Sequence, residues 1–131
     1  MLKKLTPNLM VEDVKKTVTF YRDVLGFELL ATVPPDGEHF GWAMMKRDGV
    51  ELMFQSRESL VHDLPGLGLE QTPIGASQTF YIEVEGVRAL YEALKDKVEI
   101  VAELHTTFYD TEEFYFRDCN GYILSFSESL Q

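Results

Sequence analysis

The sequence predicts an α+β protein built from two βαβββ modules. Two observations support this prediction: strand-like and helix-like patterns follow the same order in both halves, and a short motif recurs where each helix begins. The first module is expected at residues 5–55 and the second at 77–128. Because 131 residues suffice for one well-packed core, we expect a single domain over residues 1–131.

The first module opens with a strand followed by an amphipathic helix. Leu5, Leu9 and Val11 share one parity, which is the period-two pattern of a strand. Asp13 occupies the position of a helix N-cap, and Gly26 that of a glycine just past the helix end. Between them, apolar residues recur at the three- and four-residue spacing of one helix face, namely Val14, Val18, Tyr21 and Leu25.

Three further strands complete this module, and the second module repeats the order. The first-module strands are expected at 27–33, 40–46 and 50–55, separated by the turns Pro34-Pro35-Asp36-Gly37 and Arg47-Asp48-Gly49. In the second module we expect strands at 77–85, 98–105, 112–117 and 122–127, and a helix with the apolar stripe Val87, Leu90, Tyr91 and Leu94.

The two halves also match in local sequence. Val11-Glu12-Asp13-Val14 corresponds to Val84-Glu85-Gly86-Val87, and each segment precedes a helix. Residues 56–76 between the modules are rich in glycine and proline without a sustained period, which predicts a connecting loop. One module covers only one face of its sheet with a helix, so two modules are expected to enclose the other face as a cleft.

Composition narrows the class of partner. With 12 basic and 22 acidic residues the net charge is −10, which disfavours nucleic acid and anionic membranes and leaves cationic ligands open. Cys119 is the only cysteine, so no intrachain disulfide can form and a cytoplasmic location is expected. No apolar run approaches the roughly 18 residues that a membrane span needs.

Several motifs indicate a family. They are Val11-Glu12-Asp13-Val14, Phe20-Tyr21-Arg22-Asp23-Val24-Leu25-Gly26-Phe27, Gly49-Val50-Glu51-Leu52 and Asp118-Cys119-Asn120-Gly121-Tyr122. On these motifs the chain, from Leu5 to Ser127, resembles the vicinal oxygen chelate superfamily of glyoxalases, dioxygenases and bleomycin-resistance proteins. The resemblance implies a glyoxalase/bleomycin-resistance-type fold, in which a curved mixed sheet encloses a cleft, and a homodimer.

The same resemblance implies four cleft positions that carry His or Glu ligands in metal-dependent members. The corresponding residues here are Thr6, Glu51, Thr79 and Ser125. Zinc, nickel and ferrous iron need imidazole, thiolate or carboxylate donors, and hydroxyl groups are poor substitutes. We therefore expect no metal and no other cofactor.

The leading hypothesis is a metal-free binding protein similar to bleomycin-resistance proteins, which sequesters a small organic molecule. Strand parity places hydroxyl, amide, carboxylate and soft apolar groups on the enclosed faces, a mixture typical of pockets for cationic or aromatic molecules. The candidate ligand-binding residues are Thr6, Asn8, Trp42, Glu51, Met53, Thr79, Tyr81, Glu83, Tyr115 and Ser125.

Three alternatives stay open. Glu51 could be the general base of a metal-independent lyase or isomerase, although no Lys or Arg at the cleft positions supplies an electrophile. A glyoxalase-like enzyme with an atypical metal site is the second alternative. The third is a degenerate scaffold whose pocket is filled by its own side chains.

Overall fold

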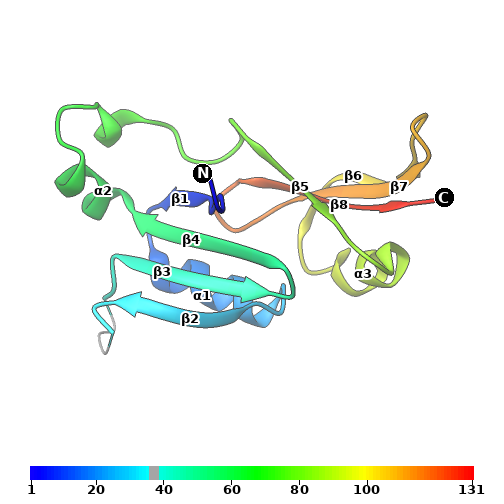
Figure 1. Ribbon diagram of the computed structural model, residues 1–131, viewed down its shortest axis with the longest axis horizontal. Helices are drawn as coiled ribbons and strands as arrows, with labels where there is room; N and C mark the ends of the chain where they lie inside the picture. Colours follow the sequence, from blue (N-terminus) through cyan, green and yellow to red (C-terminus); the bar gives the residue numbers. More distant parts are fainter. Residues whose placement is uncertain (36–38) are drawn as a thin grey trace. The chain divides into compact units, whose positions relative to one another are not determined.

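The computed structural model describes residues 1–35 and 39–131, which form two compact units. Unit 1 comprises Met1–Pro73 and unit 2 comprises Ile74–Gln131, so the boundary falls inside the predicted connecting segment. Each unit contains a strand, a helix and three strands in that order (Figure 1). The predicted α+β class and two-module organisation are confirmed.

Unit 1 contains a four-stranded mixed sheet with the order β1-β4-β3-β2. Strand β1 runs parallel to β4, and the other neighbours are antiparallel. The expected turn at 34–37 extends into residues that lie outside the described part of the chain. The elements of this sheet and its helix are β1 (Asn8–Val11), α1 (Val14–Asp23), β2 (Glu28–Val33), β3 (Trp42–Arg47) and β4 (Val50–Ser56).

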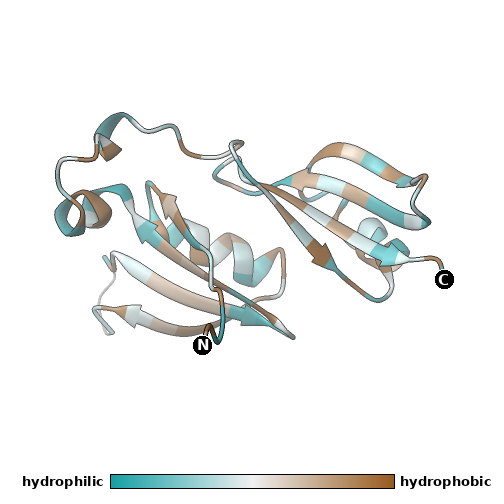
Figure 2. Ribbon diagram, turned by 45° about the horizontal axis from the view of Figure 1, so that its top comes forward, coloured by the Kyte–Doolittle hydropathy of each residue, from teal (hydrophilic) through white to brown (hydrophobic). Residues whose placement is uncertain are grey.

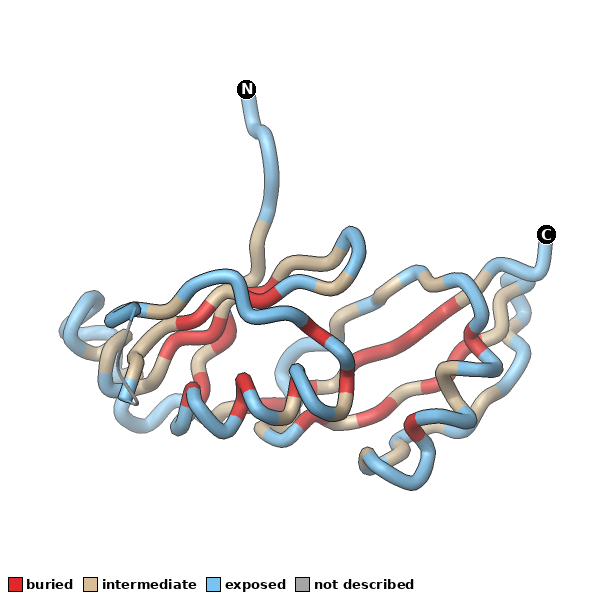
Figure 3. Tube along the Cα trace, turned by 90° about the horizontal axis from the view of Figure 1, so that it is seen from below, coloured by how far each residue is buried: buried red, intermediate tan, exposed pale blue. Residues whose placement is uncertain are grey.

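The helix α1 begins and packs as the sequence predicts. The side chain of Asp13 accepts a hydrogen bond from the backbone N–H of Lys16 at 3.0 Å, which caps the first turn. All four residues of the predicted apolar stripe are buried, and buried residues recur along one side of the helix (Figure 3). The ring of Tyr21 lies 4.7 Å from that of Phe54 on β4, so α1 covers one face of this sheet.

The first strand is shorter than predicted. Leu5 is exposed and Thr6 precedes the strand, which begins only at Asn8. Ladder pairing starts when the carbonyl of Pro7 accepts the N–H of Met53 at 2.8 Å. Because proline has no N–H to donate, the ladder weakens at this position and Thr6 stays outside it.

The connecting segment is not the structureless loop that its composition suggested. It contains helix α2 (Arg57–Asp63) and the 3₁₀ turn η1 (Leu69–Gln71). Ser56 caps α2 by accepting the N–H of Ser59 at 3.1 Å, and a helix of two turns is too short to show a period in the sequence. Arg57 holds the segment together through the carboxylate of Glu12 and the carbonyls of Leu69 and Thr72.

Unit 2 repeats the topology with the order β5-β8-β7-β6, in which β5 runs parallel to β8. Its strands carry hydrophobic and hydrophilic residues in succession (Figure 2). Phe114 and Phe126 are among the buried residues on the face covered by the helix, where Phe114 meets Tyr91 at 5.1 Å. The elements are β5 (Thr79–Glu83), α3 (Val87–Leu94), β6 (Glu99–Thr106), β7 (Thr111–Arg117) and β8 (Ile123–Ser129).

The helix α3 is capped from another strand. Its N-cap residue is Gly86, which has no side chain to accept a hydrogen bond. The carboxylate of Glu128, near the end of β8, accepts the N–H groups of Gly86 and Val87 at 3.0 Å each. These two bonds hold the pKa of Glu128 below its usual value. Within the described residues, no helix has both the length and the apolar character to cross a membrane.

Candidate functional site

The uncovered face of the unit 1 sheet carries the predicted mixture of polar and soft apolar side chains. Asn8 pairs with Met53, and Trp42 pairs with Gln55, across neighbouring strands. Leu52, which lies between Glu51 and Met53 on β4, points to the opposite face and is buried under α1. Asn8, Trp42, Met53 and Glu51 therefore share the face away from α1, as strand parity predicts.

Within unit 1, Gln55 connects this face to α2. Its carbonyl oxygen accepts a hydrogen bond from Asn8 at 2.9 Å. Its amide nitrogen donates to the hydroxyl of Ser59 and to the carboxylate of Asp63, both at 2.9 Å. Gln55 is buried and uses its oxygen and both amide hydrogens, so it fixes α2 at the end of β4 and is less available to a ligand.

Glu51 has a partner inside its own unit. The ammonium group of Lys4 forms an ion pair with Oε2 of Glu51, whose side chain is 21% exposed. The predicted carboxylate at this position is therefore partly shielded, and its charge is balanced. Thr6, two residues after Lys4, is half-buried.

In unit 2, the face away from α3 brings together five of the predicted residues. Thr79, Tyr81 and Glu83 of β5 pair with Ile123, Ser125 and Ser127 of β8. On the other side of β8, Tyr115 of β7 pairs with Ser125. Ser125 thus lies between two tyrosines, while Thr79 and Glu83 are exposed.

Ser125 is the unusual member of this group. Its side chain is 1% exposed, and its hydroxyl oxygen has no hydrogen-bond partner among the described residues. A buried hydroxyl without a hydrogen-bond partner lowers the stability of the fold by about 1–3 kcal/mol. Proteins therefore rarely contain one unless a water molecule or a ligand forms a hydrogen bond with it.

The most connected polar group on this face is Glu113, which the sequence reasoning missed. It is 1% exposed, and its carboxylate accepts hydrogen bonds from the hydroxyls of Tyr109 at 2.5 Å and Thr111 at 3.1 Å. The hydroxyl of Tyr115 approaches the carboxylate at 3.4 Å. A further bond from Ser127 extends the network to Tyr81, whose hydroxyl donates to Ser127 at 2.8 Å.

This network fixes the ionisation of its members. Burial alone would raise the pKa of Glu113, but the hydrogen bonds from Tyr109, Ser127, Thr111 and Tyr115 outweigh it and lower the pKa below its usual value. The hydrogen bond between Tyr109 and Glu113, together with burial and the negative charge of Glu113, raises the pKa of Tyr109 to about 12. Burial and the charge of Glu113 raise the pKa of Tyr115. At neutral pH the cluster is a carboxylate held by neutral hydroxyls.

A sequence signal for Glu113 was present. The residue lies two positions before Tyr115 on the same strand, so it shares the parity of a residue already predicted in the site. Tyr109 had no such signal, because it lies in the turn between β6 and β7 and reaches Glu113 only through the folded turn.

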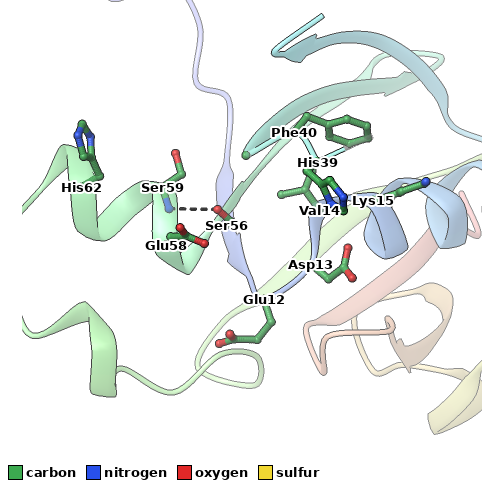
Figure 4. Close-up of a pocket in the computed structure, with 11 residues that line it drawn as sticks. Glu12, Asp13, Val14, Lys15, His39, Phe40, Ser56, Glu58, Ser59 and His62 are labelled. Carbon is green, nitrogen blue, oxygen red and sulfur yellow. Dashed lines mark hydrogen bonds between the residues drawn. The ribbon is translucent and has the colours of Figure 1, made fainter. Parts of the chain in front are cut away.

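Unit 1 has a cavity elsewhere, of about 680 Å³, at the start of α1 and beside α2 (Figure 4). None of the ten predicted residues lines it. Several of its polar groups already serve the fold: Asp13 caps α1, Ser56 caps α2, and Glu12 pairs with Arg57 at 2.5 Å. This cavity therefore offers few uncommitted groups to a ligand.

The four predicted ligand positions are divided between the two units and carry few metal-binding groups. Unit 1 supplies Thr6 and an ion-paired Glu51, while unit 2 supplies Thr79 and Ser125. Residues 1–35 and 39–131 contain no group of three or more His, Cys, Asp or Glu side chains placed to hold a metal ion. This set of hydroxyls and one carboxylate is a poor fit to zinc, nickel or ferrous iron.

Comparisons with known proteins agree with the fold. The Glyoxalase/Bleomycin resistance protein/Dioxygenase superfamily matches residues 5–126, and the chain belongs to this superfamily. A bleomycin resistance protein from Geobacillus stearothermophilus is 29% identical over 130 residues, which cover 95% of this chain and 96% of that protein. A bleomycin resistance protein from Staphylococcus aureus matches to the same extent.

A solved structure has the same architecture. A glyoxalase/bleomycin resistance protein/dioxygenase from Nocardioides superposes with a TM-score of 0.77 at 20% identity, covering 100% of this chain and 87% of that one. At this identity the likeness shows the fold, and function has to be argued from the site.

Proposed function

We propose that this protein binds a small organic molecule, cationic or aromatic, on the sheet faces that point away from helices α1 and α3, without a metal ion. The observation that carries the proposal is Ser125, a buried hydroxyl without a partner that lies between Tyr81 and Tyr115. A ligand with a polar group would form a hydrogen bond with this hydroxyl, and the two tyrosine rings would provide apolar contact with the ligand.

The residues at the four predicted metal-ligand positions favour the binding of an organic molecule over metal-dependent catalysis. Three of the four positions carry neutral hydroxyls, and the ammonium of Lys4 engages the fourth, Glu51. An ammonium on this oxygen occupies a position that a general base would use to accept a proton, so it gives no support to the lyase or isomerase alternative. The relatives named bleomycin resistance protein make cationic glycopeptides the first compounds to try.

Isothermal titration calorimetry with bleomycin and a panel of aromatic drugs tests the proposal. We expect saturable heat with at least one compound. Ser125→Ala should weaken that binding and leave the free protein as stable or more stable, since it removes an unsatisfied buried hydroxyl. Ser77→Ala is the matched control, because Ser77 is exposed just before β5.

Two outcomes would overturn the proposal. One is the absence of heat with every compound in the panel. The other is tight, stoichiometric uptake of zinc, nickel or iron by the purified protein, which would favour an enzyme with an atypical metal site.

A further inference from the structure

A shallow cavity of about 530 Å³, broadly open to solvent, lies in unit 2 beside β6, β7 and the turn that joins them. It contains none of the predicted site residues except Tyr115. Four of its nine lining residues carry rings, one carries a carboxylate, and the other four are aliphatic residues or threonines. The rings belong to His105, Phe108, Tyr109 and Tyr115, and the carboxylate belongs to Glu113.

The carboxylate in this wall is a charge without a cationic partner. Glu113 is buried, and its hydrogen-bond donors among the described residues are all neutral hydroxyls. The nearby arginines are engaged elsewhere: Arg117 pairs with Glu99 at 2.7 Å and Arg88 with Glu112 at 2.8 Å. In the described part of the chain, no Lys, Arg or His forms an ion pair with Glu113, and a buried carboxylate lacking a countercharge favours a cation nearby.

The rings around this carboxylate suit a cation. Tyr109 and Tyr115 direct their hydroxyls to Glu113, so their orientations are fixed by the same group. The ring of His105 stacks on Tyr115 with a centroid distance of 6.4 Å and an interplanar angle of 16°. Phe108 contacts Tyr109 edge-to-face at 5.0 Å and is otherwise exposed on the turn. Aromatic rings attract ammonium groups through their electron-rich faces.

We propose that this cavity is the subsite for an ammonium group of the ligand, which lies against the rings of Phe108, Tyr109 and Tyr115 and faces the charge of Glu113. This inference rests on the proposed function, because it assigns one part of the bound molecule to one place in unit 2. The net charge of −10 would favour the approach of such a ligand but would not discriminate among sites. Discrimination comes from the rings and the buried carboxylate.

The test uses phenyltrimethylammonium as the probe and benzyl alcohol as an uncharged aromatic counterpart. Chemical shifts of backbone amides are followed in the full chain at pH 8, where imidazoles are ordinarily neutral. The probe is expected to shift the amides of residues 105–115, with benzyl alcohol binding more weakly. Glu113→Gln should weaken binding of the probe by roughly tenfold.

Two further variants make this result specific. Glu103→Gln removes the same charge from an exposed position on β6 and should leave binding of the probe unchanged. Phe108→Ala removes an exposed ring, so it should leave the fold intact and weaken binding of the probe severalfold. If Glu113→Gln does not fold, Phe108→Ala decides the question.

Equal losses of affinity for the probe in Glu113→Gln and Glu103→Gln would overturn the inference, because they would indicate attraction by the acidic surface alone. Equal affinity for benzyl alcohol would also overturn it. If the probe shifts no amide of residues 105–115 while a compound of the calorimetric panel still binds and depends on Ser125, the subsite is wrong and the proposed function stands. If neither binds, both fail.

Discussion

The hydroxyl of Tyr109 donates to Oε1 of Glu113 over 2.5 Å, from the turn between β6 and β7 to the strand that follows it. Each group stabilises the protonation state that the other has at neutral pH: the carboxylate stays ionised, and the pKa of the phenol rises to about 12. A turn with an exposed phenylalanine is thereby tied to a buried carboxylate.

Tyr109→Phe removes this hydrogen bond and keeps the ring. We expect the melting temperature to fall by roughly 3–6 °C, as for the loss of one charge-assisted bond in a domain of this size. Tyr91→Phe is the matched control, because the Tyr91 hydroxyl makes no hydrogen bond to residues 1–35 or 39–131 and its ring packs on Phe114. Thermal unfolding followed by circular dichroism measures both. An equal shift in the two variants would contradict the role given to the Tyr109 hydroxyl.

The same residue predicts an alkaline transition. Because the pKa of Tyr109 is raised to about 12 in the folded protein, its contribution to stability is complete below the unfolded value of about 10 and is lost as pH rises toward 12. Ultraviolet absorbance at alkaline pH should show a late-titrating tyrosine in the wild type. Because the pKa of Tyr115 is raised as well, Tyr109→Phe should reduce the amplitude of that late component and leave the part due to Tyr115. An unchanged amplitude would contradict the role given to Tyr109.

Glu113→Gln tests how the stability of the protein depends on pH in the acidic range. The pKa of Glu113 is lowered on folding, so its contribution to stability is present above the unfolded value and is lost as pH falls through the folded value. The wild type should therefore lose stability more steeply than Glu113→Gln as the pH is reduced from 6 to 3. Urea unfolding at a series of pH values measures the difference, and parallel curves would rule out this contribution.

Glu128→Ala should destabilise unit 2 by uncapping α3. The substitution leaves the N–H groups of Gly86 and Val87 without the carboxylate that they share. We expect a fall of roughly 3–6 °C in melting temperature, the usual scale for a lost helix cap in a chain of this length. Glu85→Ala removes an exposed carboxylate next to the same helix start and should have little effect. Equal effects would indicate a general charge effect.

Metal addition gives the remaining prediction. The hydroxyls of Thr6, Thr79 and Ser125 are weak donors, so equilibrium dialysis against zinc, nickel or ferrous iron followed by elemental analysis should show no stoichiometric uptake. Saturable uptake of an ion that is lost in Glu51→Gln would contradict this expectation and identify Glu51 as a ligand.

The sequence by itself determined the two βαβββ modules and the apolar face of helix α1. The spacing of Val14, Val18, Tyr21 and Leu25 was enough to place α1, because an amphipathic period records which face of a helix is apolar. Strand parity likewise put Tyr81 and Ser125 on the same face, but the pairing of β8 with β5 and β7, which sets Ser125 between Tyr81 and Tyr115, came from the structure. Helix α2 was missed, since a helix of two turns capped by Ser56 leaves too few residues for a period.

Only the tertiary structure decided which polar groups have partners. Lys4 meets Glu51 across 47 positions of sequence, Glu128 caps a helix 41 positions away, and Tyr109 reaches Glu113 through a folded turn. No local pattern encodes these meetings, because hydrogen bonds depend on distances that arise when strands and turns pack. For the same reason, the unpartnered hydroxyl of Ser125 and the uncompensated charge of Glu113 could be found only in three dimensions.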